Sequence, residues 1–294
     1  MKTAIAKAAV LLEAMPYIQK FKGSTVVIKF GGSVLENQEL ANQALRDIVF
    51  LEMVGIKTVI VHGGGKEISA ELEKMAIPVK FIKGQRFTCK KTIKVVDEVL
   101  HNIINPRIVS TIESHGGKAV RLSGKNVLIG HKLEPSADTD NADLGFVGEV
   151  HNVNTKEIKE IIKDNIIPVI TPLALGDDGK TIFNINADIA AAKVAEMLQA
   201  NKLVFISDVP GVLKDPKNEA TLISTIYSNE IDAYIKDGII SGGMIPKIRS
   251  AQKALNAGAN KVHMIDGRVK HSILLEIFTD SGIGTQILNS AQRV

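Results

Sequence analysis

Apolar and polar positions alternate along the chain in a pattern typical of strands followed by helices. Near-continuous apolar runs predict buried strands at 25–30, 57–62, 118–123, 126–130, 166–171, 202–207 and 261–265, and a hairpin arm at 144–152. Helical periodicity between these runs predicts helices at 40–54, 66–75, 88–114, 156–163, 186–200, 246–257 and 271–278. Strands that are apolar on both faces need cover on both sides. The pattern therefore predicts an α/β fold, an αβα sandwich around a mostly parallel sheet.

The first 22 residues show a separate helical pattern. Apolar residues recur on one face from Ile5 to Phe21, and we expect Pro16 to kink this helix. Charged residues interrupt the segment too often for a signal peptide or a membrane span. The apolar stripe needs a partner surface, on its own chain or on another subunit.

Two further features predict how the chain is organised. Thr88 is placed to cap the long helix at 88–114, and Pro106 is expected to kink it. The turn-rich tract at 176–179 predicts a hinge between two lobes, at 23–175 and 176–294.

Composition narrows the classes of function. The chain has 294 residues, a formal net charge of +4 and only 4% aromatic residues, and its basic residues are spread along the sequence. No nucleic-acid footprint is evident, while mild positive charge suits small anionic substrates. The single cysteine, Cys89, excludes an internal disulfide and a cysteine-based metal site, and it fits a reducing cytoplasm.

Two glycine loops follow predicted strands. Gly31 and Gly32 come directly after Lys29 and Phe30, and His62 leads into a run of three glycines at 63–65. Backbone N–H groups in such loops, at the start of a helix, can bind an anion, although a tight structural turn has the same pattern. Neither loop matches the Walker A or the G-x-G-x-x-G pattern, which disfavours a dinucleotide oxidoreductase.

Several polar residues lie where chemistry is plausible. Arg86 could clamp a carboxylate with its planar guanidinium, or simply lie on the surface. The segment at 184–188 offers more polar groups than a helix cap needs, and Asp188 can hold lysines in place. Lys247 falls in the first turn of a helix, where the dipole disfavours a cation unless an anion is bound nearby. Asp208 follows an apolar strand, and ligands of open α/β sheets bind beyond such strand ends.

Taken in order, these stretches resemble the amino-acid kinase family over about 25–288. The resemblance implies a carbamate kinase-like fold, with an amino-acid substrate lobe at 23–175 and a nucleotide-binding lobe at 176–294. Two more stretches, at 84–88 and 143–150, are similar to the members that phosphorylate the γ-carboxylate of N-acetyl-L-glutamate in arginine biosynthesis. The implied cofactors are ATP and Mg²⁺. The metal would be held mainly by the ATP phosphates, without a protein ligand.

The resemblance also implies roles for matched positions. Catalytic roles fall on Lys29, Lys247 and Asp188. Substrate binding falls on Gly64, Gly65, Arg86 and Asn184. Nucleotide binding falls on Gly31, Gly32, Asp208, Gly211, Leu213, Ser241 and Gly242. The chain departs from the family pattern at Ser33, Gln85, Cys89 and Arg121, which leaves the detail of the substrate lid open.

The segment at 1–22 resembles the extension of arginine-inhibited family members. In those relatives such helices interlace dimers into a hexamer, and arginine binds beside them. The matched arginine-binding positions are Tyr17, His263, Glu276 and Gly282. The alternatives are another kinase of the family, acting on carbamate or aspartate, and a catalytically silent subunit that senses arginine.

Overall fold

A computed structural model describes residues 2–136, 139–256, 259, 261–279 and 282–290. Its centre is an eight-stranded sheet in the order β12-β14-β13-β11-β1-β2-β8-β5. All neighbouring strands are parallel except β13 and β14. The mostly parallel sheet is therefore confirmed. The bounds of its strands are β1 (Thr25–Phe30), β2 (Lys57–His62), β5 (Ala119–Leu122), β8 (Ile167–Ile170), β11 (Lys202–Ser207), β12 (Thr225–Tyr227), β13 (Lys261–Asp266) and β14 (Thr285–Leu288).

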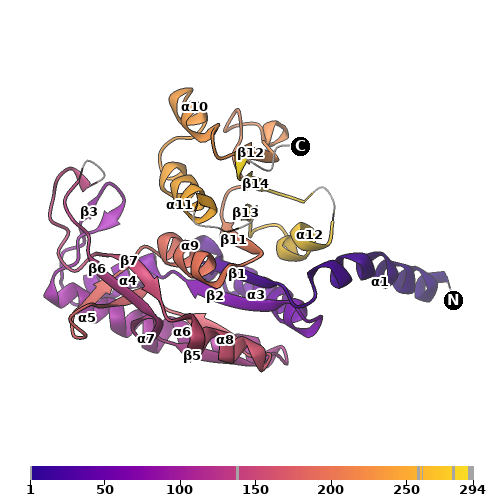
Figure 1. Cartoon of the computed structure of the whole chain (residues 1–294), viewed down its shortest axis with the longest axis horizontal. Helices are drawn as coiled ribbons and strands as arrows, with labels where there is room; N and C mark the ends of the chain where they lie inside the picture. The colour runs from indigo at the N-terminus through magenta and orange to yellow at the C-terminus, as the bar shows by residue number, and fades with distance from the viewer. Residues whose placement is uncertain (1, 137–138, 257–258, 260, 280–281, 291–294) are drawn as a thin grey trace.

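Helices cover both faces of this sheet, as predicted (Figure 1). Side chains of β1 alternate between two apolar cores: Val27 belongs to one, and Val26 and Ile28 belong to the other. The core of Val27 is closed by α8 (Thr155–Lys163), α9 (Ala187–Leu198) and α11 (Met244–Asn256). The opposite core is closed by α3 (Gln38–Met53), α6 (Asn105–Ser114) and α12 (Ser272–Phe278). The chain is an αβα sandwich.

A four-stranded sheet lies beside the central one, in the order β10-β9-β6-β7. The tract expected to be a hinge at 176–179 joins two of its strands, which pair antiparallel, so it is a hairpin turn and the prediction of a hinge there is wrong. Division into a substrate lobe and a nucleotide lobe stays a prediction. The strands are β6 (Leu128–Lys132), β7 (Gly148–Val153), β9 (Leu173–Gly176) and β10 (Ile182–Asn184).

The long helix predicted at 88–114 has three parts. A π-helix, η1 (Val99–Ile104), separates α5 (Lys90–Glu98) from α6 and ends two residues before Pro106. Cys89 occupies the N-cap position instead of Thr88, whose hydroxyl donates a hydrogen bond to the Arg86 carbonyl. The remaining elements are α1 (Lys2–Phe21), α2 (Ser33–Glu36), α4 (Gly65–Lys74), α7 (Gly124–Val127), α10 (Ile231–Lys236), η3 (Glu219–Thr221), β3 (Phe81–Ile82) and β4 (Gln85–Arg86).

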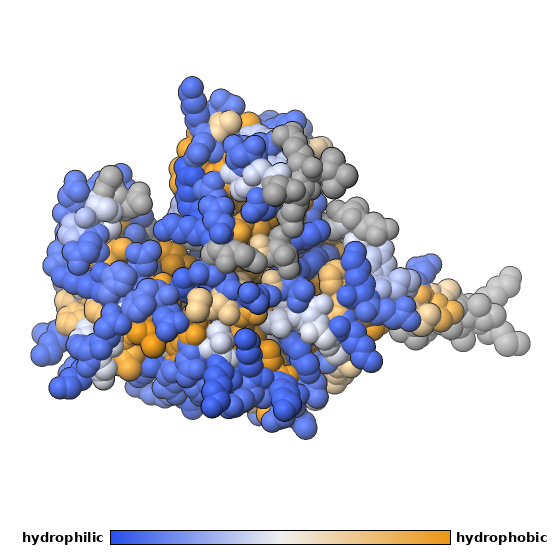
Figure 2. Space-filling view, in the orientation of Figure 1, coloured by the Kyte–Doolittle hydropathy of each residue, from blue (hydrophilic) through white to orange (hydrophobic). Residues whose placement is uncertain are grey.

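Helix α1 projects from the body of the molecule (Figure 1), and Figure 2 shows hydrophobic surface along it. It continues through Pro16 as one helix, with Leu12 63% and Met15 47% exposed. Its apolar stripe thus remains partly uncovered within a single chain. No helix in the described part of the chain has the length and apolar character needed to cross a membrane.

Candidate functional site

The glycine loops meet because β1 and β2 are parallel neighbours whose carboxyl ends share one edge of the sheet. The Gly63 N–H donates to the Phe30 carbonyl at 2.8 Å, which ties the two loops together. Among the described residues, none accepts a hydrogen bond from the N–H of Gly64 or Gly65. Both glycines line a cavity of about 230 Å³, so two unpaired donors border it.

Lys29 and Asp188 both line this cavity and form an ion pair there. Lys29 lies on the same face of β1 as Val27, which is the face that α9 covers, and Asp188 lies in the first turn of α9. The Lys29 Nζ is 3.0 Å from Asp188 Oδ1, and the two side chains are only 12% and 11% exposed. Asn186 alone caps α9, accepting from the N–H groups of Asp188 and Ile189. Asp188 is therefore free to hold the lysine.

Gly31 leaves room for this lysine. A Cβ at Gly31 would lie 3.2 Å from the Lys29 Nζ, so a side chain there would crowd the ammonium group. Gly32, which lines the same cavity, has a φ of +66°, a conformation that favours glycine. The first glycine loop is thus shaped around a cation at the edge of the cavity.

Arg86 reaches the cavity from the β3–β4 hairpin, whose turn is made by Lys83 and Gly84, both at positive φ. Its Nη2 donates to the Gly65 carbonyl at 2.7 Å and to the Ser69 hydroxyl at 2.8 Å. The guanidinium carbon lies 4.7 Å from the centre of the Phe81 ring.

The other guanidinium nitrogen of Arg86, Nη1, is buried and has no hydrogen-bond partner among the described residues. Burial lowers the pKa of Arg86 below its ordinary value, but a guanidinium is so strong a base that the group remains a cation at neutral pH. A buried, charged donor left without an acceptor is costly. Its presence on a cavity wall favours an anionic ligand.

Asn184 lies on the wall of the same cavity, at the end of β10. Its side-chain amide donates to the Thr88 hydroxyl at 3.2 Å, and its backbone N–H donates to the Phe146 carbonyl at 2.8 Å. These bonds join β10 to the two segments that carry Thr88 and Phe146. The structure thus gathers around one cavity six residues to which the resemblance gives catalytic or substrate-binding roles: Lys29, Asp188, Gly64, Gly65, Arg86 and Asn184. Their roles stay predictions.

A second cavity, of about 410 Å³, adjoins the first and shares Gly32, Gly64, Gly65 and Phe81 with it. Asp208, one of the predicted nucleotide-binding residues, lines this second cavity. Figure 2 shows the surface hollowed between the part of the molecule that carries β3 and the part above it that carries α10 and α11.

Gly32, also predicted to bind the nucleotide, lines both cavities, but the remaining predicted residues line neither: Gly31, Gly211, Leu213, Ser241 and Gly242. Gly211 packs tightly, since a Cβ there would lie 2.5 Å from the Thr285 hydroxyl, and Leu213 forms a bridge with Leu222. Ser241 and Gly242 are exposed just before α11. Lys247 lies in the first turn of α11, and the structure does not bring it to Lys29. The roles proposed for these residues stay predictions.

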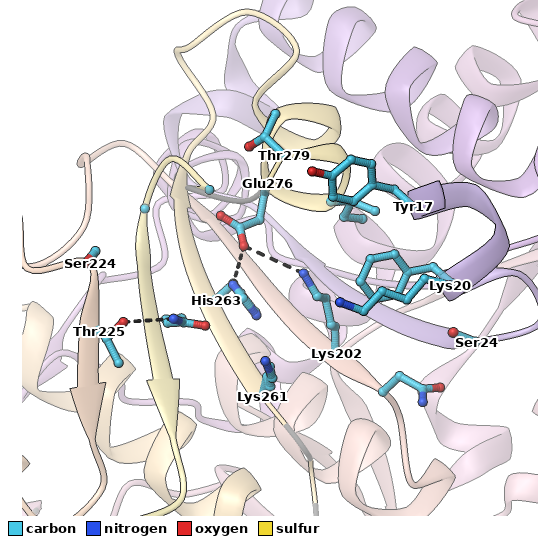
Figure 3. Close-up of a pocket in the computed structure, with 16 residues that line it drawn as sticks. Tyr17, Lys20, Ser24, Lys202, Ser224, Thr225, Lys261, His263, Glu276 and Thr279 are labelled. Atoms are coloured by element: carbon cyan, nitrogen blue, oxygen red, sulfur yellow. Dashed lines mark hydrogen bonds and ion pairs between the residues drawn. The ribbon is translucent and has the colours of Figure 1, made fainter. Parts of the chain in front are cut away.

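A third cavity lies at the base of α1 and has a volume of about 620 Å³ (Figure 3). All four residues matched to arginine binding line it: Tyr17, His263, Glu276 and Gly282. Figure 3 shows the Tyr17 ring reaching from α1 toward the side of the cavity where Glu276 lies. A Cβ at Gly282, whose φ is +58°, would lie 2.8 Å from Glu276 Oε2, so only glycine fits beside this carboxylate.

The Glu276 carboxylate is held by its neighbours. Its Oε1 contacts the His263 Nδ1 and lies 3.8 Å from the Lys202 Nζ, and its Oε2 accepts from the Ile283 N–H at 3.2 Å. Burial raises the pKa of Glu276, but the hydrogen bond from His263 and the charges of His263 and Lys202 outweigh it, so the pKa lies below its ordinary value. This carboxylate is an anion at neutral pH.

Sequence reasoning missed several residues of these cavities. Ser69 and Phe81 position Arg86, and Thr88 accepts from Asn184. Three lysines line the third cavity, Lys20, Lys202 and Lys261. The sequence offered one signal for these lysines, because Lys202 is a charged residue at the start of an otherwise apolar strand.

Comparisons with known proteins agree with this arrangement. A model of the amino acid kinase family matches residues 24–266. A protein named acetylglutamate kinase from Thermoanaerobacter sp. (strain X514) is 47% identical over 283 residues, which is 96% of this chain and 93% of the relative. Another of that name, from Syntrophomonas wolfei, is 43% identical over 287 residues, covering 98% of this chain and 99% of the relative.

Solved structures share the fold. N-acetylglutamate synthase from Neisseria gonorrhoeae, complexed with coenzyme A and N-acetyl-glutamate, has a TM-score of 0.83 and 26% identity, covering 96% of this chain and 63% of that chain. Carbamate kinase from Giardia lamblia bound to AMP-PNP shares the fold, with a TM-score of 0.68 and 17% identity, covering 91% of this chain and 99% of that chain. The resemblance seen in the sequence is confirmed: the chain belongs to the amino acid kinase family.

Proposed function

We propose that this protein is an acetylglutamate kinase, which transfers the γ-phosphoryl group of ATP to the γ-carboxylate of N-acetyl-L-glutamate. The observation that carries the proposal is one cavity lined both by Arg86, whose Nη1 is buried and unpartnered among the described residues, and by the Lys29–Asp188 pair. One cationic group binds a carboxylate, and another lies where a phosphoryl group can be transferred. The names of relatives that match nearly the whole chain support the choice of substrate.

In this proposal Arg86 binds the α-carboxylate of the substrate through Nη1, while Nη2 remains bonded to Gly65 and Ser69. Asn184 and the free N–H groups of Gly64 and Gly65 complete the binding site. The γ-carboxylate is already ionised at neutral pH, so it attacks phosphorus without a general base. This fits a site that offers cations and N–H donors.

During transfer, one carboxylate oxygen forms a bond to the γ-phosphorus of ATP as the bond to the bridging oxygen of ADP breaks. Negative charge moves onto ADP, and the products are an acyl phosphate and ADP. Lys29 stabilises charge on the transferring group, and Asp188 fixes the position of the Lys29 ammonium group. We propose that Lys247 contributes a second cation from the first turn of α11, as the sequence predicted.

We propose that ATP binds in the adjoining cavity that Asp208 lines, where a Mg²⁺ ion carried on its phosphates would neutralise part of their charge. Asp188 is already paired with Lys29. In the described part of the chain, no three His, Cys, Asp or Glu residues gather where they could hold a metal ion. That Mg²⁺ is held mainly by the ATP phosphates, without a protein ligand, stays a prediction from the resemblance. The cytoplasmic location stays a prediction from the sequence.

A coupled assay of ADP release tests the proposal. The purified protein should turn over ATP with N-acetyl-L-glutamate, and hydroxylamine should trap the acyl phosphate. Carbamate, aspartate and unacetylated glutamate serve as competing substrates in the same panel. Preference for carbamate or aspartate would assign the chain to another kinase of the family. If the protein releases no ADP with any of these substrates, the result would favour a catalytically silent subunit that senses arginine.

We also propose that arginine inhibits this enzyme from the third cavity (Figure 3). Glu276 offers a buried anion for a guanidinium, and Lys20, Lys202 and Lys261 offer cations for the α-carboxylate of the same ligand. Tyr17 and Lys20 come from α1, so ligand binding there would depend on the position of that helix. A neighbour of known structure, the N-acetylglutamate synthase of N. gonorrhoeae, is complexed with L-arginine in one structure. Interlaced α1 helices in a hexamer are part of this proposal.

A further inference from the structure

His62 and Asn105 form a buried polar pair directly behind the second glycine loop. Both residues are 0% exposed. His62 ends β2, immediately before Gly63, and Asn105 begins α6 immediately after the π-helix η1. Neither side chain lines the cavity that holds Lys29 and Arg86. Their polar atoms therefore act on the protein and not on a ligand.

The hydrogen bonds of this pair fix the protonation of the histidine. The His62 Nδ1 lies 2.9 Å from the Gly63 carbonyl oxygen, which can only accept, so Nδ1 carries the proton. The Asn105 amide nitrogen donates to the Val169 carbonyl at 2.7 Å and lies 3.3 Å from the His62 Nε2. Its second hydrogen requires an acceptor, which is the unprotonated Nε2. Burial lowers the pKa of His62 to about 4, so the ring is neutral near pH 7.

The bond to Gly63 orients a donor on the opposite side of the same peptide. In a trans peptide unit the carbonyl of one residue and the N–H of the next point in opposite directions, and the described chain has no cis peptide bond. The Gly63 carbonyl points to the buried ring of His62. The Gly64 N–H consequently points away from that ring, and Gly64 lines the cavity. No described residue accepts from it.

The π-helix packs against the same loop. A Cβ at Gly64 would lie 2.3 Å from the Ile104 Cδ1 and 3.0 Å from the Leu100 Cδ2. Leu100, Ile104 and Asn105 therefore all face the glycine loop from one side of the helix. A π-helix interrupts regular helical spacing and is often found at functional sites. Here it places two apolar contacts and one amide donor behind a single peptide.

We infer that His62, held by Asn105, is a positioning residue that aims the Gly64 N–H at the anionic substrate. The inference rests on the proposed function, because it assumes that the substrate occupies the cavity bordered by Gly64. The chemistry recognised is that of a carboxylate or of the phosphoryl oxygen transferred to it. The competing explanation is that the pair only fastens β2 to α6 and has no effect on ligand affinity.

Two substitutions at one position separate these explanations. The amide nitrogen of asparagine superposes on the Nδ1 of histidine, and that of glutamine superposes on Nε2. His62→Asn thus keeps the donor to Gly63, whereas His62→Gln loses it. We expect His62→Gln to raise the KM for N-acetyl-L-glutamate about 10-fold or more, which is the loss of one hydrogen bond to a charged group. His62→Asn should stay within about 3-fold of the unaltered enzyme, and the KM for ATP should change less than about 2-fold in both.

Thermal unfolding of both variants shows whether each is folded under the assay conditions. Equal KM values for N-acetyl-L-glutamate in two folded variants would overturn the inference. If neither variant folds, ¹⁵N NMR of the unaltered protein decides instead. The Nδ1–H tautomer of His62 should persist between pH 5.5 and 8, and the Nε2–H tautomer would overturn the inference.

Failure of the proposed function gives a different result. It appears as absence of turnover of N-acetyl-L-glutamate by the unaltered enzyme. The KM comparison is then made with whichever substrate of the panel is phosphorylated. The tautomer measurement needs no substrate and is unaffected.

Discussion

Lys29 Nζ lies 3.0 Å from Asp188 Oδ1, and this contact joins the end of the central strand β1 to the first turn of α9. The partners are 159 positions apart in the sequence, so only the completed sheet brings them together. A lysine held by a carboxylate has a fixed position. It can therefore stabilise a developing charge without reorganising when the reaction occurs.

Replacing either proposed catalytic lysine should abolish most turnover. Lys29→Ala removes a preorganised cation from the cavity, and Lys247→Ala removes the cation proposed to act from α11. We expect kcat to fall roughly 10²–10³-fold in each variant, the usual effect of losing one electrostatic donor. The coupled ADP assay measures this directly.

Lys74→Ala is the matched control, because the side chain of that lysine is 72% exposed and pairs with Glu71 one turn away. It should leave kcat unchanged. Near-normal turnover in Lys29→Ala would remove its catalytic role. Near-normal turnover in Lys247→Ala would contradict the catalytic role proposed for that residue, which does not line the cavity.

The fold was largely predictable because its strands are buried on both faces. The apolar runs that became β1, β2 and β11 carry no competing polar pattern, and both glycine loops follow such strands. The neighbours Lys29, Gly31 and Gly63 meet as a consequence of parallel strand pairing, which the alternation of strands and helices indicates.

Other features depend on contacts that are distant in sequence. The turn at 176–179 has the composition of a linker, and only the pairing of β9 with β10 makes it a hairpin. Thr88 has the chemistry of a helix cap, but its hydroxyl bonds to the Arg86 carbonyl and to Asn184. The π-helix is also invisible locally, because nothing in the sequence at 99–104 shows which partners its side chains meet.

Changing Arg86 to lysine should weaken substrate binding selectively. Lysine keeps the charge but cannot bond to the Gly65 carbonyl, to Ser69 and to a ligand with a planar fork. We expect the KM for N-acetyl-L-glutamate to rise about 10- to 100-fold, while that for ATP changes little. Equal weakening of both constants would show that Arg86 is structural and that another residue binds the carboxylate.

Replacing Gly64 and Gly65 by alanine, one at a time, should separate the effect of packing on stability from the effect on substrate binding. At Gly64 a Cβ would meet Ile104 at 2.3 Å, whereas at Gly65 it would meet nothing within 4 Å. We expect Gly64→Ala to lower the free energy of unfolding by about 1–3 kcal/mol, the usual effect of overpacking, and to raise the KM for the substrate. Gly65→Ala should retain normal stability by chemical denaturation and still raise that KM, because its methyl group enters the cavity. Unchanged kinetics in Gly65→Ala would place the substrate elsewhere.

The buried histidine predicts how stability depends on pH. The pKa of His62 is about 4 in the folded chain, against 6.5 for an unperturbed histidine. Between these values the unfolded chain binds a proton that the folded chain does not, so the free energy of unfolding falls as pH falls. From pH 7.5 to pH 5 this single group should remove about 2 kcal/mol.

Other buried groups also change how the free energy of unfolding depends on pH. The contribution of His62 is therefore measured by comparing the unaltered protein with the His62→Asn variant. Burial raises the pKa of Asp47 and of Glu52, which acts in the opposite direction. The fall in stability between pH 7.5 and pH 5, measured by urea denaturation, should therefore be smaller in the variant by about 2 kcal/mol. Parallel curves for the two proteins would show that His62 titrates normally in the folded chain.

Arginine inhibition should depend on both Glu276 and α1. Inhibition requires that arginine bind one conformation better than another, and by linkage arginine and N-acetyl-L-glutamate should weaken each other's binding by the same factor. Glu276→Gln removes the anion that faces the cavity, so the arginine concentration for half-inhibition should rise about 10- to 100-fold with basal turnover retained.

Deleting residues 1–22 removes Tyr17 and Lys20 from the same cavity and should leave an active dimer with little response to arginine. Glu160→Gln, at an exposed position of α8, is the control and should respond as the intact protein does. Sedimentation of the intact protein should show a hexamer. A dimer whose activity is indifferent to millimolar arginine would contradict the regulatory proposal and leave the kinase assignment in place.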